Sequence, residues 1–158
     1  MLRVVVLNVL EDAEIGREAF SIINLVREKY RGESGYVESV RSRCRQLYGY
    51  LFRAGILSTI AYVYAKGGES LVKTAFRWMT IQSNLPPRGK EEDVGYAIYA
   101  ASLCRLLEKI GFPTDEASLG KVIEALTLDP AATMILEEQS LRFARWLKRF
   151  AEALLSPE

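Results

Sequence analysis

The sequence contains no histidine among its 158 residues. Catalytic triads, Cys-His pairs, histidine-bearing zinc sites and most general bases that act near neutral pH therefore have no candidate in this chain. The glycine-rich motifs of P-loop and dinucleotide-binding proteins are absent as well. We expect no catalytic residue, no cofactor and no metal site.

Cysteine is scarce: only Cys44 and Cys104 are present, each inside an apolar run with helical periodicity. Such thiols are most often buried and reduced, so we expect no disulfide and a cytoplasmic protein. Adjacent carboxylates such as Glu91 and Glu92 do occur. Neighbouring residues of a helix point about 100° apart, so these pairs are typical of solvated helix ends rather than of a catalytic dyad.

No apolar run is long enough to cross a bilayer, because the longest stretch without a charged residue extends only from Ala54 to Ala65. The apolar run Leu2 to Leu10 is followed by acids and by no small-residue cleavage site, so we do not expect a signal peptide. Hydrophobic residues make up 49% and charged residues 26%, an ordinary globular composition. We expect one helical domain over residues 1–158, with its core in residues 12–155.

Apolar residues recur every three or four positions along most of the chain, which predicts amphipathic helices separated by glycine and proline. Gly55 is expected to bend or break the chain, and Asp129 and Pro130 fit the N-cap and first position of the last helix. Leu2 to Leu10 would also suit a short extended segment. We predict an all-α fold, a compact bundle of six or seven helices, over residues 13–30, 36–53, 56–66, 69–82, 91–110, 115–126 and 130–155.

Charge is unevenly distributed along the chain. Between Glu38 and Glu91, nine residues are basic and only Glu69 is acidic. Opposite charges four positions apart on a helix attract by about 0.2–0.5 kcal/mol, so cations with such an acid are expected to form ordinary surface pairs. The predicted pairs are Glu69 with Lys73, Glu138 with Arg142, and Lys148 with Glu152.

The residues Arg41, Arg45, Gly49 and Arg53 form one ridge with a spacing of four. Only Glu38, beside Arg41, is an acid at helical spacing from any of them. Like charges on a ridge repel, which favours an outside anion such as a phosphate backbone, and Gly49 would let that backbone approach. A solvated ridge that uses its glycine for tight helix packing is the alternative, and both interpretations stay open.

Aromatic residues are interleaved with these cations. Exposed aromatic rings beside arginines can stack on the bases of a single strand, although aromatics at helical spacing more often belong to the core. We expect Tyr62 and Tyr64 in the core. Tyr50 lies off the apolar stripe and is the better candidate for stacking or for a subunit contact.

The segment LRFARWLKRF, Leu141 to Phe150, combines four cations with large apolar side chains. A membrane-surface helix, a helix that docks on another protein, and a helix that offers one face to nucleic acid all fit this pattern. We expect Trp146 and Phe150 to be buried and Arg145 and Arg149 to point outward. Arg149 can reach Glu152, whereas Arg145 has no acid at helical spacing.

Two segments resemble a known family. GILSTIAYVYAKGG, Gly55 to Gly68, follows a helix that itself follows a short break, and FARWLKRFAEALL, Phe143 to Leu155, lies near the C-terminus. Both resemble the small helical subunit of the type III-B CRISPR effector, the Cmr RNA-silencing complex. The order of the expected helices matches that family from Asp12 to Leu155.

The resemblance implies a non-catalytic subunit of a ribonucleoprotein that acts in antiviral RNA silencing. Several copies would stack head to tail beside the backbone and large subunits, with a basic face along the guide crRNA and target RNA. Lys66 and Arg149 match the family pattern residue by residue, and the other candidates rest on spacing. The predicted RNA-binding residues are Arg41, Arg45, Arg53, Lys66, Arg77, Arg145 and Arg149.

Two alternatives remain at this point. A basic amphipathic helix can lie on a membrane surface, although the apolar face of the last helix has a use inside the bundle. A helical nucleic-acid-binding or protein-interaction module unrelated to CRISPR would share the basic surface. No helix-turn-helix with a polar recognition helix stands out, which disfavours a sequence-reading DNA-binding protein. CRISPR arrays and effector genes beside this gene would decide between these readings.

Overall fold

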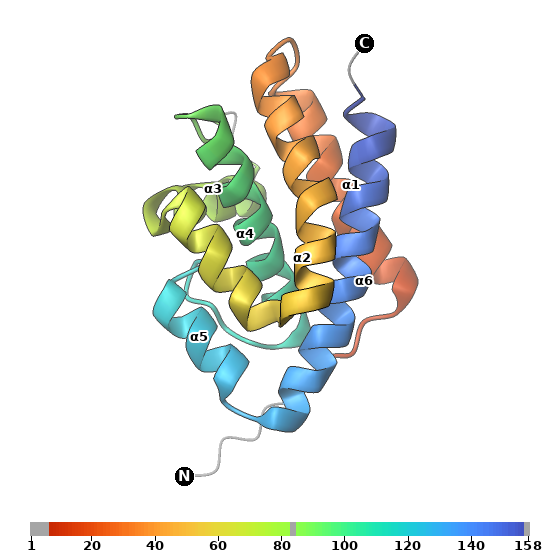
Figure 1. The fold of residues 1–158 in the computed structure, drawn as a ribbon, viewed down its shortest axis with the longest axis vertical. Coiled ribbons are helices and arrows are strands. Elements are labelled where there is room, and N and C mark those ends of the chain that lie inside the picture. Colours follow the sequence, from red (N-terminus) through yellow and green to blue (C-terminus); the bar gives the residue numbers. More distant parts are fainter. Residues whose placement is uncertain (1–6, 83–84, 157–158) are drawn as a thin grey trace.

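The computed structural model describes residues 7–82 and 85–156. Over this part of the chain it contains six α-helices and no strand, so the predicted all-α class is confirmed. The helices are α1 (Asp12–Lys29), α2 (Ser34–Gly67), α3 (Glu69–Ile81), α4 (Glu91–Ile110), α5 (Leu119–Thr127) and α6 (Pro130–Leu154), arranged as a bundle (Figure 1).

The predicted extended segment, Leu2 to Leu10, lies partly outside the described residues, which begin at residue 7. Its described part forms neither helix nor strand. The Asn8 backbone N–H donates to the carbonyl of Ile110 at 2.8 Å, and the Leu10 N–H donates to the side-chain oxygen of Gln139 at 3.0 Å. These two bonds fix the approach to α1 against α4 and α6.

The second and third predicted helices form one element, α2, which bends at Gly55 as expected. Gly55 has φ 86° and ψ 170°, a conformation that costs glycine little because it has no Cβ. Both carboxylate oxygens of Glu137 in α6 accept the Ile56 backbone N–H, at 2.9 and 3.0 Å. The segment after the bend therefore begins with a cap supplied by another helix. The two segments count together as α2, so the bundle has six helices.

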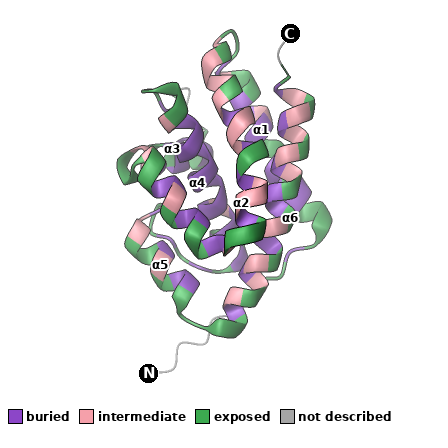
Figure 2. Ribbon diagram, in the orientation of Figure 1, coloured by how far each residue is buried: buried purple, intermediate pink, exposed green. Residues whose placement is uncertain are grey.

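Helix α4 is the most deeply buried element, and 14 of its 20 residues are buried (Figure 2). A helix that is apolar on all sides belongs in the interior. It packs against α2 and α3. Small residues permit the close approach: a Cβ placed on Gly67 of α2 would lie 2.9 Å from the backbone nitrogen of Ala97. The Cys104 thiol of α4 is buried and free, and burial raises its pKa to about 12.

Helix α2 also packs against α6, and α6 packs against α1. In the view of Figure 1, α1 and α6 lie on one side of α2, and α3 and α5 lie on the other. The Cys44 thiol of α2 is buried and free in this packing, and burial raises its pKa to about 12. The predicted burial of both cysteines is confirmed.

The prediction for the segment 115–126 is wrong at its start. Asp115, Glu116 and Ala117 have φ values of 51°, 55° and 65°, in the left-handed region, and α5 begins only at Leu119. Tertiary bonds hold this turn: the Ala117 N–H donates to the Thr114 hydroxyl at 3.1 Å, and the Tyr64 hydroxyl donates to the Ala117 carbonyl at 2.7 Å. Local periodicity does not reveal a turn that a distant tyrosine stabilises.

The start of α6 is as predicted, because the Asp129 side chain accepts the Ala131 backbone N–H at 3.0 Å.

The predicted burial of Trp146 and Phe150 is wrong: both are only half-buried. The fully buried large side chains of this segment are Phe143 and Leu147. Because successive residues of a helix turn by about 100°, burying Phe143 and Leu147 rotates Trp146 and Phe150 onto the edge against α1.

Candidate nucleic-acid interface

Helix α2, which carries the predicted ridge, packs against α6, which carries the other predicted cations. The Arg45 Nε lies 3.5 Å from a carboxylate oxygen of Glu152 in α6, and the Lys148 Nζ lies 5.4 Å from the ring centre of Tyr48 in α2. These contacts join the ridge to the last helix. We refer to the surface formed by Arg41, Arg45, Arg53, Arg145 and Arg149 as the α2–α6 face.

The ridge itself differs in detail from the prediction. A Cβ placed on Gly49 would lie 3.7 Å from an Nη atom of Arg53, so the Arg53 guanidinium covers the gap that was expected to admit a phosphate. Arg53 is exposed and forms no ion pair with any described residue. Arg41 is half-buried, and its nearest acid, Glu38, is 3.9 Å away. The ridge therefore exposes the guanidinium groups of Arg45 and Arg53, whereas the Arg41 side chain is largely buried.

Arg145 and Arg149 are both exposed, as predicted, and neither forms an ion pair within the described part of the chain. The Arg149 guanidinium lies 5.6 Å from the centre of the Trp146 ring. The predicted pair between Lys148 and Glu152 is not formed, because Glu152 faces Arg45 instead. Spacing along one helix misses this partner, which comes from a neighbouring helix.

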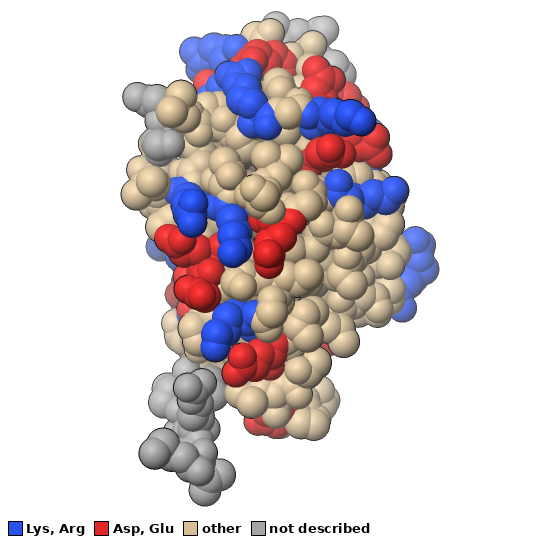
Figure 3. Space-filling model, turned by 90° about the vertical axis from the view of Figure 1, so that its left-hand side faces the viewer, with Lys and Arg blue, Asp and Glu red and all other residues tan. Residues whose placement is uncertain are grey.

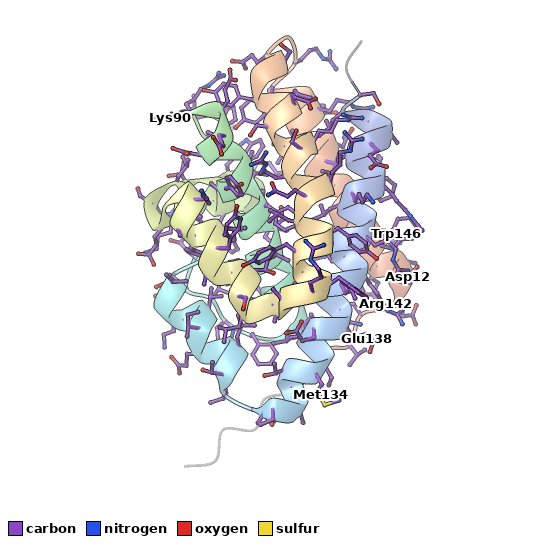
Figure 4. All side chains as sticks on the ribbon, viewed as in Figure 1. Asp12, Lys90, Met134, Glu138, Arg142 and Trp146 are labelled. Carbon is purple, nitrogen blue, oxygen red and sulfur yellow. The ribbon has the colours of Figure 1, made fainter. Side chains whose placement is uncertain are left out.

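Glu138, Arg142 and Trp146 follow one another along α6 with a spacing of four (Figure 4). Glu138 and Arg142 form the predicted ion pair at 2.8 Å. Trp146 donates its ring N–H to Asp12 of α1 at 3.2 Å. This row therefore marks the edge of the α2–α6 face, where α6 meets α1.

Lys66 and Arg77 do not join this face. The Lys66 Nζ lies 5.8 Å from the ring centre of Tyr62, on the segment of α2 after the bend. Arg77 of α3 donates to Glu116 at 3.1 Å. On the side of the molecule that carries α3 and α5, basic and acidic groups lie next to each other (Figure 3). The structure thus separates these two predicted residues from the other five.

The aromatic residues near the ridge differ in how far they are buried. Tyr64 is buried as predicted, whereas Tyr62 is half-buried and stacks on Tyr50 with ring centres 5.0 Å apart. The ring face of Tyr50 is therefore occupied within the chain. Phe52, which the sequence did not single out, is 69% exposed next to Arg53. Phe52 follows the buried Leu51 directly, and neighbouring residues of a helix point about 100° apart, so its exposure could have been predicted from the sequence.

Acidic side chains can serve as metal ligands and as proton donors or acceptors. The described residues contain no group of His, Cys, Asp or Glu side chains arranged to hold a metal ion. The buried carboxylate of Glu18 accepts hydrogen bonds from the Arg105 Nε at 2.9 Å and is 3.0 Å from the Lys109 Nζ. Burial alone would raise the pKa of Glu18, but these bonds outweigh it and lower that pKa. The carboxylate is an internal ion-pair partner.

A comparison with protein-family models matches residues 12–154 to the family described as CRISPR-associated protein (Cas_Cmr5). The chain belongs to this family. The match confirms the resemblance seen in Gly55 to Gly68 and Phe143 to Leu155. A comparison with curated proteins and one with solved structures each found no match.

The segment Leu141 to Phe150, for which the sequence also allowed a membrane-surface helix, belongs to α6 of the bundle. Phe143 and Leu147 of that segment pack inside the bundle, and Arg145 and Arg149 are exposed. None of the helices in the described part of the chain has the length and apolar character needed to cross a bilayer.

Proposed function

We propose that this chain is the non-catalytic small subunit of a type III-B CRISPR effector in the cytoplasm, and that its α2–α6 face contacts guide and target RNA. The observation that carries the proposal is the meeting of the α2 ridge with the cations of α6 on one face. Arg53, Arg145 and Arg149 have no acidic partner among the described residues. Family membership supplies the CRISPR context.

The chemistry of this face favours contacts to the RNA backbone rather than to bases. Guanidinium groups bind phosphate oxygens through paired N–H donors, and such contacts carry no sequence information. Arg45 remains available for this role despite Glu152, because an ion pair between exposed side chains contributes only about 0–1 kcal/mol. Binding is therefore independent of sequence and sensitive to salt.

Contacts between copies and with other subunits complete the proposal. Phe52 and Met134 are 69% and 75% exposed and are the apolar side chains at which we place these contacts. One subunit offers few phosphate contacts, so it binds RNA weakly alone. Stacked copies bind much more tightly, because each additional contact then forms at a high effective concentration.

The test is target-RNA binding by the reconstituted effector over a range of salt concentrations. Subunits carrying Arg45→Glu and Arg145→Glu should bind more weakly, and each lost phosphate contact should lower the salt slope by about 0.7 for a single strand. Arg77→Glu, which lies off the α2–α6 face, is the matched control and should leave the slope unchanged. Assembly is checked separately by size.

Normal assembly together with unchanged affinity and slope in the double variant would show that these arginines are solvated surface. The subunit would then act as an architectural spacer without RNA contacts. A loss that is equal in the Arg77→Glu control would show that overall charge, and not this face, determines binding.

A further inference from the structure

A hollow of about 1230 Å³ lies where the turn between α1 and α2 meets the end of α6. The turn between α1 and α2 and the end of α6 both lie at the top of the molecule in Figure 1. Leu154, Leu155 and Ser156 form the wall on the side of α6, and Gly32 to Gly35 form the wall on the side of the turn. The hollow is separate from the outward surface formed by Arg53, Arg145 and Arg149.

Three arginines line the hollow: Arg27 on α1, Arg31 in the turn and Arg41 on α2. Arg31 is exposed and forms no hydrogen bond or ion pair with any described residue. Arg27 donates one N–H to the side chain of Asn24 at 2.6 Å, which leaves its other donors unused. The Nε of Arg41 is buried and has no hydrogen-bond partner in the described structure. That atom is closed to solvent, so a ligand in the hollow would bind the other guanidinium donors of Arg41.

The acids that line the hollow are already engaged. Both carboxylate oxygens of Glu33 accept from the guanidinium of Arg88, which approaches from the connection before α4. Glu38 accepts the hydroxyl of Ser42 at 3.1 Å and lies 3.9 Å from Arg41. No acid that lines the hollow contacts Arg27 or Arg31. The start of α2 favours an anion, whereas the ends of α1 and α6 disfavour one, so the attraction for an anion must come from the three guanidinium groups.

We propose that this hollow is a phosphate-binding site in which Arg27, Arg31 and Arg41 hold one phosphate group. Several planar guanidinium groups around one concave surface match the several oxygens of a phosphate. The inference rests on the proposed function in one respect, because Arg41 also begins the ridge of the α2–α6 face. A phosphate in the hollow would then be the end of the same RNA path.

The test is calorimetric titration of the full-length chain with inorganic pyrophosphate. Arg27→Ala and Arg31→Ala should each weaken binding about tenfold, because a charge-assisted hydrogen bond is lost. Arg41→Lys should also weaken it, since lysine keeps the charge but lacks the planar guanidinium with its paired donors. Arg17→Ala, an exposed arginine of α1 outside the hollow, is the matched control and should bind as the unchanged chain does.

A short RNA with and without a 5′-phosphate distinguishes the sources of the phosphate. Preference for the phosphorylated RNA assigns the site to a chain end, and equal binding assigns it to the internal backbone. Binding of pyrophosphate without binding of either RNA assigns it to a small free anion. Absence of pyrophosphate binding up to about 10 mM, or unchanged affinity in Arg27→Ala and Arg31→Ala, would overturn the proposal.

The same variants separate this inference from the proposed function. Pyrophosphate binding that depends on Arg27 and Arg31 stands even if Arg45→Glu and Arg145→Glu leave RNA binding by the effector unchanged. Loss of RNA binding in Arg45→Glu and Arg145→Glu, without pyrophosphate binding by the isolated chain, supports the α2–α6 face and rejects the hollow. Circular dichroism of each variant shows that the helices remain intact.

Discussion

Glu137 of α6 holds the Ile56 backbone N–H of α2 between its two carboxylate oxygens, at 2.9 and 3.0 Å. The bond lies at the bend of α2, directly after Gly55, where the second segment of the helix would otherwise begin without a cap. One side chain thereby connects the direction of the second segment to the last helix.

Glu137→Ala is therefore expected to destabilise the protein by about 1–2 kcal/mol, the usual cost of losing a helix cap. Glu137→Gln retains an acceptor oxygen and should cost less. Urea denaturation followed by circular dichroism measures both free energies of unfolding. Equal and negligible effects would show that the bend needs no support from α6.

Phe143→Ala and Phe150→Ala should differ in their cost. Phe143 is fully buried, so its truncation should lower the free energy of unfolding by about 3–5 kcal/mol. Phe150 is half-buried beside Phe20 and Trp146, so the expected loss is only about 1–2 kcal/mol. Thermal or urea denaturation of the two variants gives the comparison. The reverse order would mean that α6 is rotated about its axis.

Tyr99→Phe should leave the stability unchanged or raise it by about 1 kcal/mol. The Tyr99 hydroxyl is buried without a hydrogen-bond partner in the described structure, so removing it relieves an uncompensated desolvation cost. Tyr64→Phe is the matched control, because the Tyr64 hydroxyl donates to the Ala117 carbonyl at 2.7 Å. That change should cost about 0.5–1.5 kcal/mol. Similar losses in both variants would indicate that Tyr99 has a partner, such as a buried water.

The stability of the protein should fall at acidic pH partly through Glu18. The pKa of Glu18 lies below its ordinary value of 4.5 in the folded state, because Arg105 and Lys109 bond to its carboxylate. A lowered folded-state pKa contributes stability above the unfolded pKa, and this contribution is lost as the pH falls through the folded pKa.

Glu18→Gln tests this linkage. Near neutral pH it should cost about 1–3 kcal/mol, since two cations lose a charged acceptor. The difference from the unchanged chain should begin to shrink as the pH falls below about 4.5, where Glu18 of the unfolded chain takes up a proton, and should be lost below the lowered folded-state pKa, where Glu18 is neutral in both states. Denaturation curves at several pH values measure it. A difference that does not vary with pH would assign the loss to packing rather than to charge.

Much of the helical architecture follows from local properties of the sequence. Apolar periodicity predicts most of the helices, Asp129 and Pro130 start α6 as expected, and the glycine at position 55 predicts the bend of α2. These features depend on residues within about one helical turn of each other, where backbone geometry and hydrogen bonding are decided by near neighbours. The match to the CRISPR-associated family likewise comes from the sequence.

The surface chemistry depends instead on contacts between residues that are far apart in the chain. Glu152 reaches Arg45 and not Lys148, and the Tyr64 hydroxyl holds the carbonyl of Ala117 in a turn where a helix was predicted. Helical spacing describes only the neighbours on the same helix. The packing of α1, α2 and α6 determines which cations lie on the same face and which of them have no acidic partner. Only this packing brings side chains from different helices within bonding distance.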